Sequence, residues 1–195
     1  MCTLSLNYRV SVRFCAAVLA SAALAASCTS GAPTRVVDRL DQSTGTTVIV
    51  LANALELVTA ENRGPSADPF AFAAPFVVDR EGNRELYLWV SVPQDRGAPS
   101  SVRVICGDQP LELTAARLDL SRLQISRPPY PQVAPWSGDW YYRLPDAALA
   151  CLAGAGSMSI ESTINDKDGE HTDRFISQPG DLRGFAAFAA HLKGQ

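Results

Sequence analysis

Two runs of alternating residues, separated by a short turn, are the feature of this sequence that most restricts its fold. Apolar side chains occupy every second position from Phe70 to Val78 and again from Leu86 to Val92. A period of two places alternate side chains on opposite faces of a β-strand. Gly82 and Asn83 between the runs are typical of a tight turn, so the sequence predicts a β-hairpin here. Pro75 interrupts the first run and predicts an edge strand or a bulge.

The rest of the chain repeats this pattern in shorter form. Alternating segments at 101–106, 158–164 and 172–177 are bounded by turns that contain Gly and Asp. Short, closely spaced strands of this kind predict a mainly β fold, an antiparallel β-sandwich of immunoglobulin-like architecture. We also expect a short helix near 145–153, which begins with Pro, and a C-terminal helix near 179–192, which carries an apolar stripe. These helices leave an α+β fold as the alternative.

The N-terminal segment indicates export. Arg9 and Arg13 precede an uncharged apolar stretch that ends in Leu24-Ala25-Ala26-Ser27-Cys28. A basic start, a short apolar run and small residues at its end are typical of a secretory signal peptide. The cysteine at the cleavage position makes this segment resemble the signal of a bacterial lipoprotein. That resemblance implies cleavage before Cys28 and lipidation of Cys28.

The same resemblance implies a location and a division of the chain. Thr29, rather than Asp, follows the cysteine, and in enteric lipoproteins this favours the outer membrane, with the domain facing the periplasm. The alternative is cleavage after Ala25 by an ordinary signal peptidase. We therefore expect a signal peptide at 1–27, a lipidated cysteine and tether at 28–45, and a single β-rich domain at 46–195.

Four short motifs lie in the first half of the mature chain. They are Asp-Arg-Leu-Asp at 38–41, Thr-Gly at 44–45, Leu-Glu-Leu at 55–57 and Tyr-Leu-Trp at 87–89. Together they resemble motifs of uncharacterised envelope lipoproteins of bacteria. Because that family has no known activity, the resemblance assigns no function to any residue.

The cysteines predict one disulfide. Cys2 and Cys15 leave with the signal peptide, and Cys28 takes the lipid, so that Cys106 and Cys151 remain. Two thiols in an oxidising envelope compartment tend to be bridged, and we therefore expect a bond between them. The alternative is that both are small, buried apolar residues without a bond.

The charge of the chain excludes one class of partner. The net charge is −3, and the sequence contains no run of Lys or Arg. Such a chain has no electrostatic attraction for nucleic acid. We expect contact with the membrane through the N-terminal lipid, and an envelope protein or a glycan as partner.

A group of aromatic residues beside a proline-rich stretch is the candidate binding surface. Its members are Tyr130, Trp136, Trp140, Tyr141 and Tyr142. Exposed Trp and Tyr next to a rigid loop are typical of surfaces that bind proteins or glycans. The alternative is that alternate members of 140–142 belong to the core, and that the loop covers the sandwich.

Signals for catalysis or metal binding are weak. His171 and His191 are the only histidines, and neither a Gly-x-Ser-x-Gly nor a His-Glu-x-x-His motif occurs. The acidic stretch 166–170 has the wrong spacing for an EF-hand. We therefore expect no catalytic residues, no metal and no cofactor, and predict a non-enzymatic binding or accessory domain. The alternatives are a small envelope hydrolase that uses His171 and a purely structural subunit.

Overall fold

The computed structural model describes residues 34–60, 70–94, 97–113, 120–167 and 169–194, which contain ten strands and three short helices. The strands are β1 (Val36–Asp41), β2 (Thr46–Leu51), β3 (Leu55–Thr59), β4 (Phe70–Arg80), β5 (Asn83–Pro93), β6 (Ser101–Cys106), β7 (Gln109–Pro110), β8 (Ser137–Arg143), β9 (Met158–Asp166) and β10 (Gly169–Ser177). The helices are α1 (Leu120–Leu123), α2 (Asp146–Gly154) and α3 (Arg183–Lys193).

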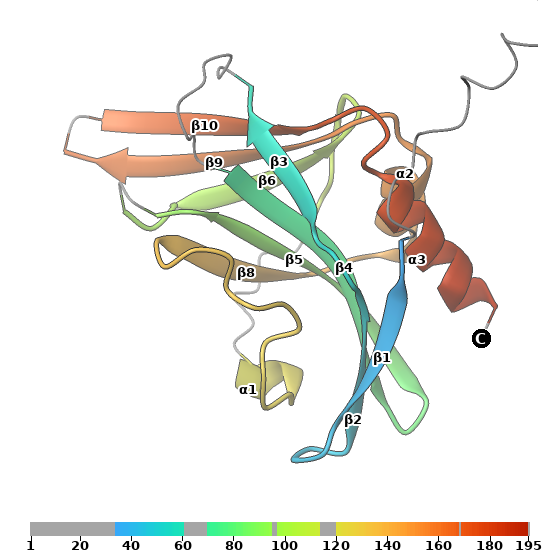
Figure 1. Ribbon diagram of the computed structural model, residues 1–195. Coiled ribbons are helices and arrows are strands. Elements are labelled where there is room, and N and C mark those ends of the chain that lie inside the picture. Colours follow the sequence, from blue (N-terminus) through green and yellow to red (C-terminus); the bar gives the residue numbers. More distant parts are fainter. Residues whose placement is uncertain (1–33, 61–69, 95–96, 114–119, 168, 195) are drawn as a thin grey trace, which may run out of the picture. The chain divides into compact units, whose positions relative to one another are not determined.

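All the strands belong to one antiparallel sheet that is organised around β4. This strand pairs with β5 along one edge, and with β2 and then β3 along the other. From β3 the sheet continues through β10, β9, β6 and β7, whereas β8 flanks β5. Because the sheet bends, β10, β9 and β6 form a layer opposite β5 and β8 (Figure 1). The predicted mainly β, sandwich-like fold is therefore confirmed, with both layers belonging to one continuous sheet.

The predicted hairpin is formed by β4 and β5. Arg80 pairs with Asn83, which leaves only Glu81 and Gly82 in the turn. Their φ angles are 53° and 87°. Two consecutive positive φ values are typical of the type I′ turn, whose twist matches that of the flanking strands. Glycine meets this requirement without strain, and the Gly82 N–H also donates to the Asp79 carboxylate at 2.9 Å.

Pro75 lies in an internal strand, so the predicted edge position is wrong. The pairing of β4 with β2 ends at Phe76, and its pairing with β3 begins at Ala73. Pro75 thus lies where β4 changes partners, and its missing N–H leaves no gap in either ladder. The Tyr130 hydroxyl fills this position: it donates to the Pro75 carbonyl at 2.7 Å and accepts from the Leu51 N–H at 3.0 Å.

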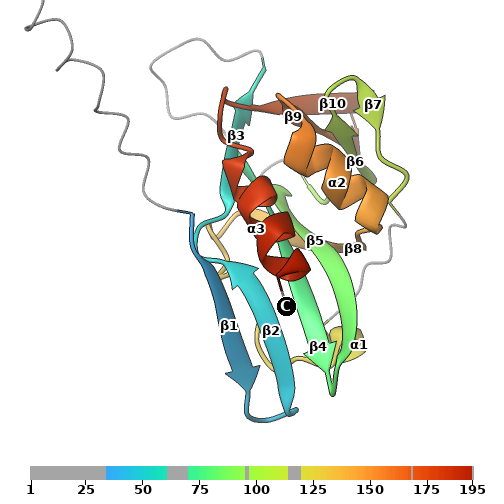
Figure 2. The same ribbon diagram turned by 90° about the vertical axis from the view of Figure 1, so that its right-hand side faces the viewer.

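Two separate apolar cores form because both faces of the central strands are covered. The larger, which we call the helix-side core, includes Leu88 and Val90 of β5 and lies beneath α2 and α3. The smaller, the loop-side core, includes Phe76 of β4 and Trp89 of β5. It lies beneath residues 120–136, which we call the covering segment. Figure 2 shows α2 and α3 together on one side of the sheet and α1 on the other.

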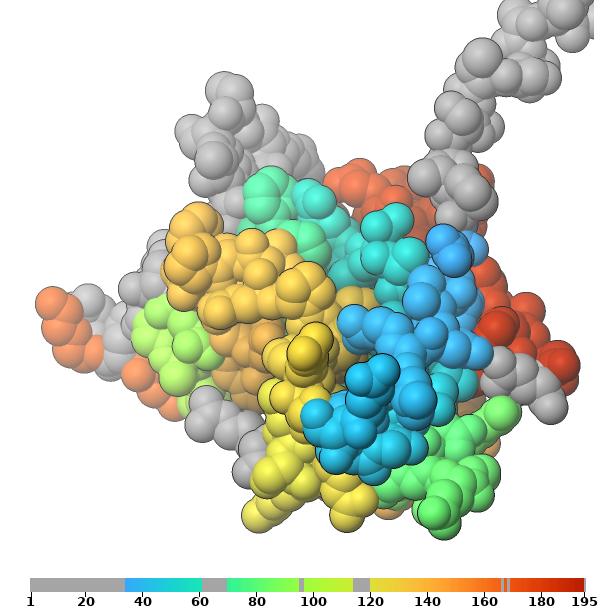
Figure 3. Space-filling model, turned by 60° about the horizontal axis from the view of Figure 1, so that its bottom comes forward, coloured from blue at the N-terminus to red at the C-terminus, as the bar shows by residue number. Residues whose placement is uncertain are grey.

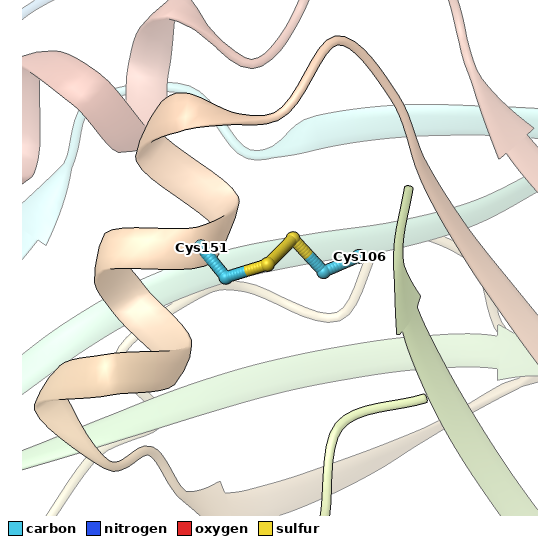
Figure 4. Close-up of a disulfide and its surroundings, with 2 residues drawn as sticks. All are labelled: Cys106 and Cys151. Carbon is cyan, nitrogen blue, oxygen red and sulfur yellow. A yellow bond between two sulfur atoms is a disulfide. The ribbon is translucent and has the colours of Figure 1, made fainter. Parts of the chain in front are cut away.

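A disulfide joins Cys106 of β6 to Cys151 of α2, as the sequence predicts (Figure 4). The Cα atoms of the two residues are 6.3 Å apart, a separation that a disulfide spans without backbone movement. The bond attaches α2 to the layer formed by β6 and β9. It therefore adds a covalent link to the helix-side core.

The two predicted helices are confirmed as α2 and α3, but the expected tether needs correction. Residues 36–45, assigned to a tether, form β1 and its turn into β2, because β1 pairs along its whole length with β2. After β6 the chain pairs back along that strand only through the two residues of β7. Between β7 and β8 the described residues contain the single helical turn α1.

Candidate functional site

The predicted aromatic binding surface is not a surface. Trp140, Tyr141 and Tyr142 are all buried, and so is Tyr130. Consecutive residues of β8 point to opposite faces, so Trp140 and Tyr142 enter the helix-side core while Tyr141 enters the loop-side core. The alternative reading, in which these residues fill the core and the loop covers it, is the correct one. Three large aromatic residues in succession indicate a strand that is covered on both faces.

Trp136 is the one member of this group that is exposed, with 59% of its surface accessible. Val133, also in the covering segment, is 45% exposed. Tyr130 instead stacks on Trp89 with ring centroids 4.9 Å apart, while burial raises its pKa far above the usual value. The phenol therefore stays neutral and can donate to Pro75 and accept from Leu51 at every physiological pH.

A hollow at the end of β1 is a candidate site in the described part of the chain. It has a volume of about 240 Å³. We call it the β1 hollow. It is lined by Arg39, Leu40, Asp41, Gln42, Ser43, Val48, Ser126, Arg127 and Pro128. In Figure 3 the β1–β2 turn adjoins the covering segment on the face turned toward the reader. The hollow therefore lies between the first hairpin and the Pro-rich stretch.

Asp41 holds the two walls of the β1 hollow together. Its carboxylate accepts hydrogen bonds from the Ser126 N–H, from the Ser126 hydroxyl at 2.8 Å, and from the Ser43 N–H at 3.1 Å. The bonds from Ser126 are the main reason why the pKa of Asp41 lies below its usual value. Asp41 is therefore ionised at neutral pH, and both of its oxygens have donors within the protein.

Two arginines also line the β1 hollow, one from each wall. Arg39 of β1 donates through its guanidinium to the Pro129 carbonyl, while Arg127 belongs to the covering segment. Both residues are exposed. The ion pairs formed among the described residues include neither of them. Cationic N–H groups are therefore available at this hollow to a bound molecule.

A cluster of three buried polar side-chain atoms lies elsewhere on the loop-side face, where β5 pairs with β8. Ser91 is opposite Asp139 in the register, and Trp89 is opposite Tyr141. Burial raises the pKa of Asp139, although the Ser91 hydroxyl and the Trp89 indole act in the opposite direction. Trp89 Nε1, Ser91 Oγ and Asp139 Oδ1 are buried, and none of them meets full hydrogen-bond geometry with another described residue, so the effect of Ser91 and Trp89 on the Asp139 pKa is smaller than that of burial. Burial of these polar atoms without hydrogen bonds lowers the free energy of unfolding.

His171, the residue of the hydrolase alternative, lies on β10. Its Nε2 atom is 2.8 Å from Asp173 Oδ1, and 46% of its side chain is exposed. His191 of α3 lies 3.6 Å from Asp38 of β1. The described residues contain no group of three or more His, Cys, Asp or Glu side chains suited to a metal ion. Cys28, the predicted lipidation site, lies outside the described residues.

The β1 hollow could not be predicted from the sequence, because the residues of one wall have the pattern of a tether. Val36 and Val37 do form a short apolar start to β1, but the charged residues at 38–41 hide it. The other wall lies mostly in the Pro-rich stretch 127–138, which predicts an extended loop. That prediction is correct for residues 127–136, but β8 already begins at Ser137. No local pattern relates Asp41 to Ser126, because 85 residues separate them.

Comparisons with family models, with curated proteins and with solved structures found no match to this chain. No helix in the described ranges has both the length and the apolar character that crossing a bilayer requires. The function must therefore be argued from the residues of the chain itself.

Proposed function

We propose that this chain is a lipid-anchored envelope protein of the outer membrane, and that its domain works by binding rather than by catalysis on the periplasmic side. The observation that carries the compartment is the bond between Cys106 and Cys151. Disulfides persist in oxidising compartments and are rare in the cytosol. The bond therefore supports export, which the N-terminal segment predicts independently.

The anchor would keep the domain close to the bilayer. Described structure begins at Thr34, and β1 begins at Val36. A fully extended chain from Cys28 to Thr34 reaches at most about 20 Å. Acyl chains contribute about 0.8 kcal/mol for each buried CH₂, so several chains on one residue give stable attachment. The partner we propose is an envelope protein or a glycan within this reach.

Binding has a candidate location on the loop-side face. The β1 hollow supplies charged and hydroxyl groups, and the exposed Leu40 belongs to its lining. Trp136 is a second exposed large apolar residue, at the opposite end of β5, where its carbonyl accepts from the Gln94 N–H. Large exposed side chains beside polar groups are typical of recognition surfaces. This combination supports a binding role better than the buried aromatic group did.

The proposal is tested by labelling and crosslinking in a bacterial envelope. Cells that express the full chain should incorporate labelled palmitate, and Cys28→Ser should abolish incorporation and leave an uncleaved precursor. A photoreactive residue at position 136 should then crosslink to a defined partner, whereas one at exposed Arg103 serves as control. Equal label in Cys28→Ser would overturn the anchor, and identical products from both positions would overturn the binding role.

A hydrolase that uses His171 is the second candidate, favoured by the contact between its imidazole and Asp173. A carboxylate that orients an imidazole is one part of a catalytic triad. Turnover of ester or amide probes that disappears in His171→Ala would establish this alternative. A purely structural subunit would give one stable crosslinked neighbour and no ligand.

A further inference from the structure

We infer that the β1 hollow is a binding site for a small oxyanion, a phosphate or a carboxylate group, held by Arg127 and Arg39. The inference rests on the proposed binding role and names the chemistry that this part of the domain recognises. Arg39 belongs to β1, and Arg127 belongs to the covering segment. The two cations thus reach the hollow from different elements of the fold.

The balance of charge in the β1 hollow favours an anion. Its lining contains two guanidinium groups and a single carboxylate, that of Asp41. Ser126 and Ser43 already donate hydrogen bonds to that carboxylate. Asp41 therefore consolidates the walls, while the two cations have no carboxylate partner among the described residues. The local charge is positive in a chain whose net charge is −3.

The same residues argue against a metal cation as the occupant. Hard cations require several oxygen ligands, usually from more than one carboxylate. Asp41 is the only carboxylate in the lining of the hollow. A cation there would also lie close to two arginines. An oxyanion meets neither objection, because a guanidinium donates to phosphate or carboxylate through two parallel N–H groups.

The size and the apolar part of the lining limit what can accompany the anionic group. A volume of 240 Å³ corresponds to roughly eight water molecules at about 30 Å³ each. Val48, Leu40 and Pro128 supply apolar surface next to the polar residues. The hollow therefore fits one anionic group attached to a short carbon skeleton.

Phosphate could reach this hollow from two sources, either as a soluble ion or as a phospholipid headgroup. The test uses the full chain purified in detergent, at constant ionic strength. Equilibrium dialysis measures the binding of labelled inorganic phosphate and labelled acetate at concentrations up to about 10 mM. A second arm measures co-sedimentation of the chain, reconstituted without excess detergent, with phosphatidylglycerol vesicles and with uncharged phosphatidylcholine vesicles.

We expect saturable binding of phosphate or acetate that falls at least tenfold in Arg127→Ala. The matched control is Arg103→Ala, which removes one exposed cation from β6, and it should bind as the unaltered chain does. Arg39→Lys keeps the charge but loses the planar fork, and should bind more weakly than the unaltered chain. Binding that depends on Arg127 only with phosphatidylglycerol vesicles would identify the headgroup as the source.

The inference is overturned if no probe binds saturably, or if Arg127→Ala and Arg103→Ala weaken binding equally. Because a lipid anchor would attach the chain to both kinds of vesicle, the second arm compares the excess of binding to phosphatidylglycerol over phosphatidylcholine. With no soluble probe bound, an excess that survives in Arg127→Ala would also overturn the inference, because the attraction would then be non-specific. Thermal unfolding of each variant shows whether it is folded. Labelling of Cys28 and crosslinking from position 136 do not involve Arg127, so a failure here is distinct from a failure of the proposed function.

Discussion

The two faces of β5 are buried in different ways. Leu88 and Val90 point into the helix-side core, beneath α2 and α3, and a disulfide attaches α2 to the sheet. Trp89 points into the loop-side core, beneath a segment with only one short helix. On the helix side, α2 and α3 are held mainly by apolar contacts, which have little directional preference. On the loop side, individual hydrogen bonds attach the covering segment.

Hydrogen bonds between specific groups attach the covering segment to the sheet. Arg80 donates to the Leu123 carbonyl at 2.9 Å, and Thr46 donates to the Gln124 carbonyl at 3.3 Å. Ser126 contacts Asp41, and Tyr130 joins β2 to β4. Such bonds fix a position, but each adds only about 1 kcal/mol of net stability. We therefore expect the covering segment to open locally before the helix side does.

The largest effect should follow the loss of the disulfide on the helix side. Cys106→Ala with Cys151→Ala removes a link across 45 residues of sequence. The chain-entropy model predicts a loss of about 4 kcal/mol in the free energy of unfolding, which urea denaturation measures. Non-reducing peptide mapping of the unaltered chain should recover the two cysteines in one linked peptide. A loss under about 1 kcal/mol would show that helix packing alone holds this side.

A cavity on the helix side should have the next largest effect. Leu88 has no exposed surface, as its place in the alternating pattern predicts. Leu88→Ala should lower the free energy of unfolding by about 3 kcal/mol, from lost burial and the cavity that remains. The control is Leu40→Ala, because Leu40 is 64% exposed and its loss should cost about 0.5 kcal/mol or less. Similar losses for both variants would contradict the assignment of the inward face.

Removal of one hydroxyl should weaken the loop side by a smaller amount. Tyr130→Phe keeps the stack on Trp89 but leaves the Leu51 N–H and the Pro75 carbonyl without their partner. We expect a loss of about 2 kcal/mol. Hydrogen exchange should accelerate at the Leu51 amide and remain unchanged at Ile160 of β9. Equal acceleration at both amides would mean that the covering segment does not open separately.

The smallest effect should be a change in pH dependence on the loop side. The pKa of Asp139 is raised by burial, so the folded state holds its proton more tightly than the unfolded state does. This carboxyl therefore reduces stability as pH rises through its folded-state pKa. Asp139→Asn should raise the melting temperature at pH 7, with no gain at pH 3.

Asp79 provides a control of opposite sign. The hydrogen bond from Arg84 at 2.9 Å lowers the pKa of Asp79, so its contribution is present at neutral pH and is lost as pH falls through the lowered pKa. Asp79→Asn should lower the melting temperature at pH 7, and this effect should shrink as pH falls through the lowered pKa. If Asp139→Asn also lowers the melting temperature at pH 7, the stabilisation of the Asp139 carboxylate by Ser91 and Trp89 outweighs the cost of burying its charge.

The candidate site was much less predictable than the strands. The hairpin, the later strands and α3 follow from local periodicity, and α2 follows from the Pro that begins it. The β1 hollow depends on contacts between Asp41 and Ser126 and between Arg39 and Pro129. Neither pair shares a local pattern. Exposed polar residues at 38–45 therefore resembled a tether.

The sequence by itself determined the alternation of β4 and β5, the helices, and the one pair of cysteines left after the predicted processing. Each of these depends on local chemistry or on counting. Only the tertiary structure decided that Trp140, Tyr141 and Tyr142 are buried on both faces of β8. Periodicity shows which residues share a face, but the cover on each face comes from segments distant in sequence. The same physical reason explains why β1 and the covering segment, 85 residues apart at their closest hydrogen bond, meet to form the hollow.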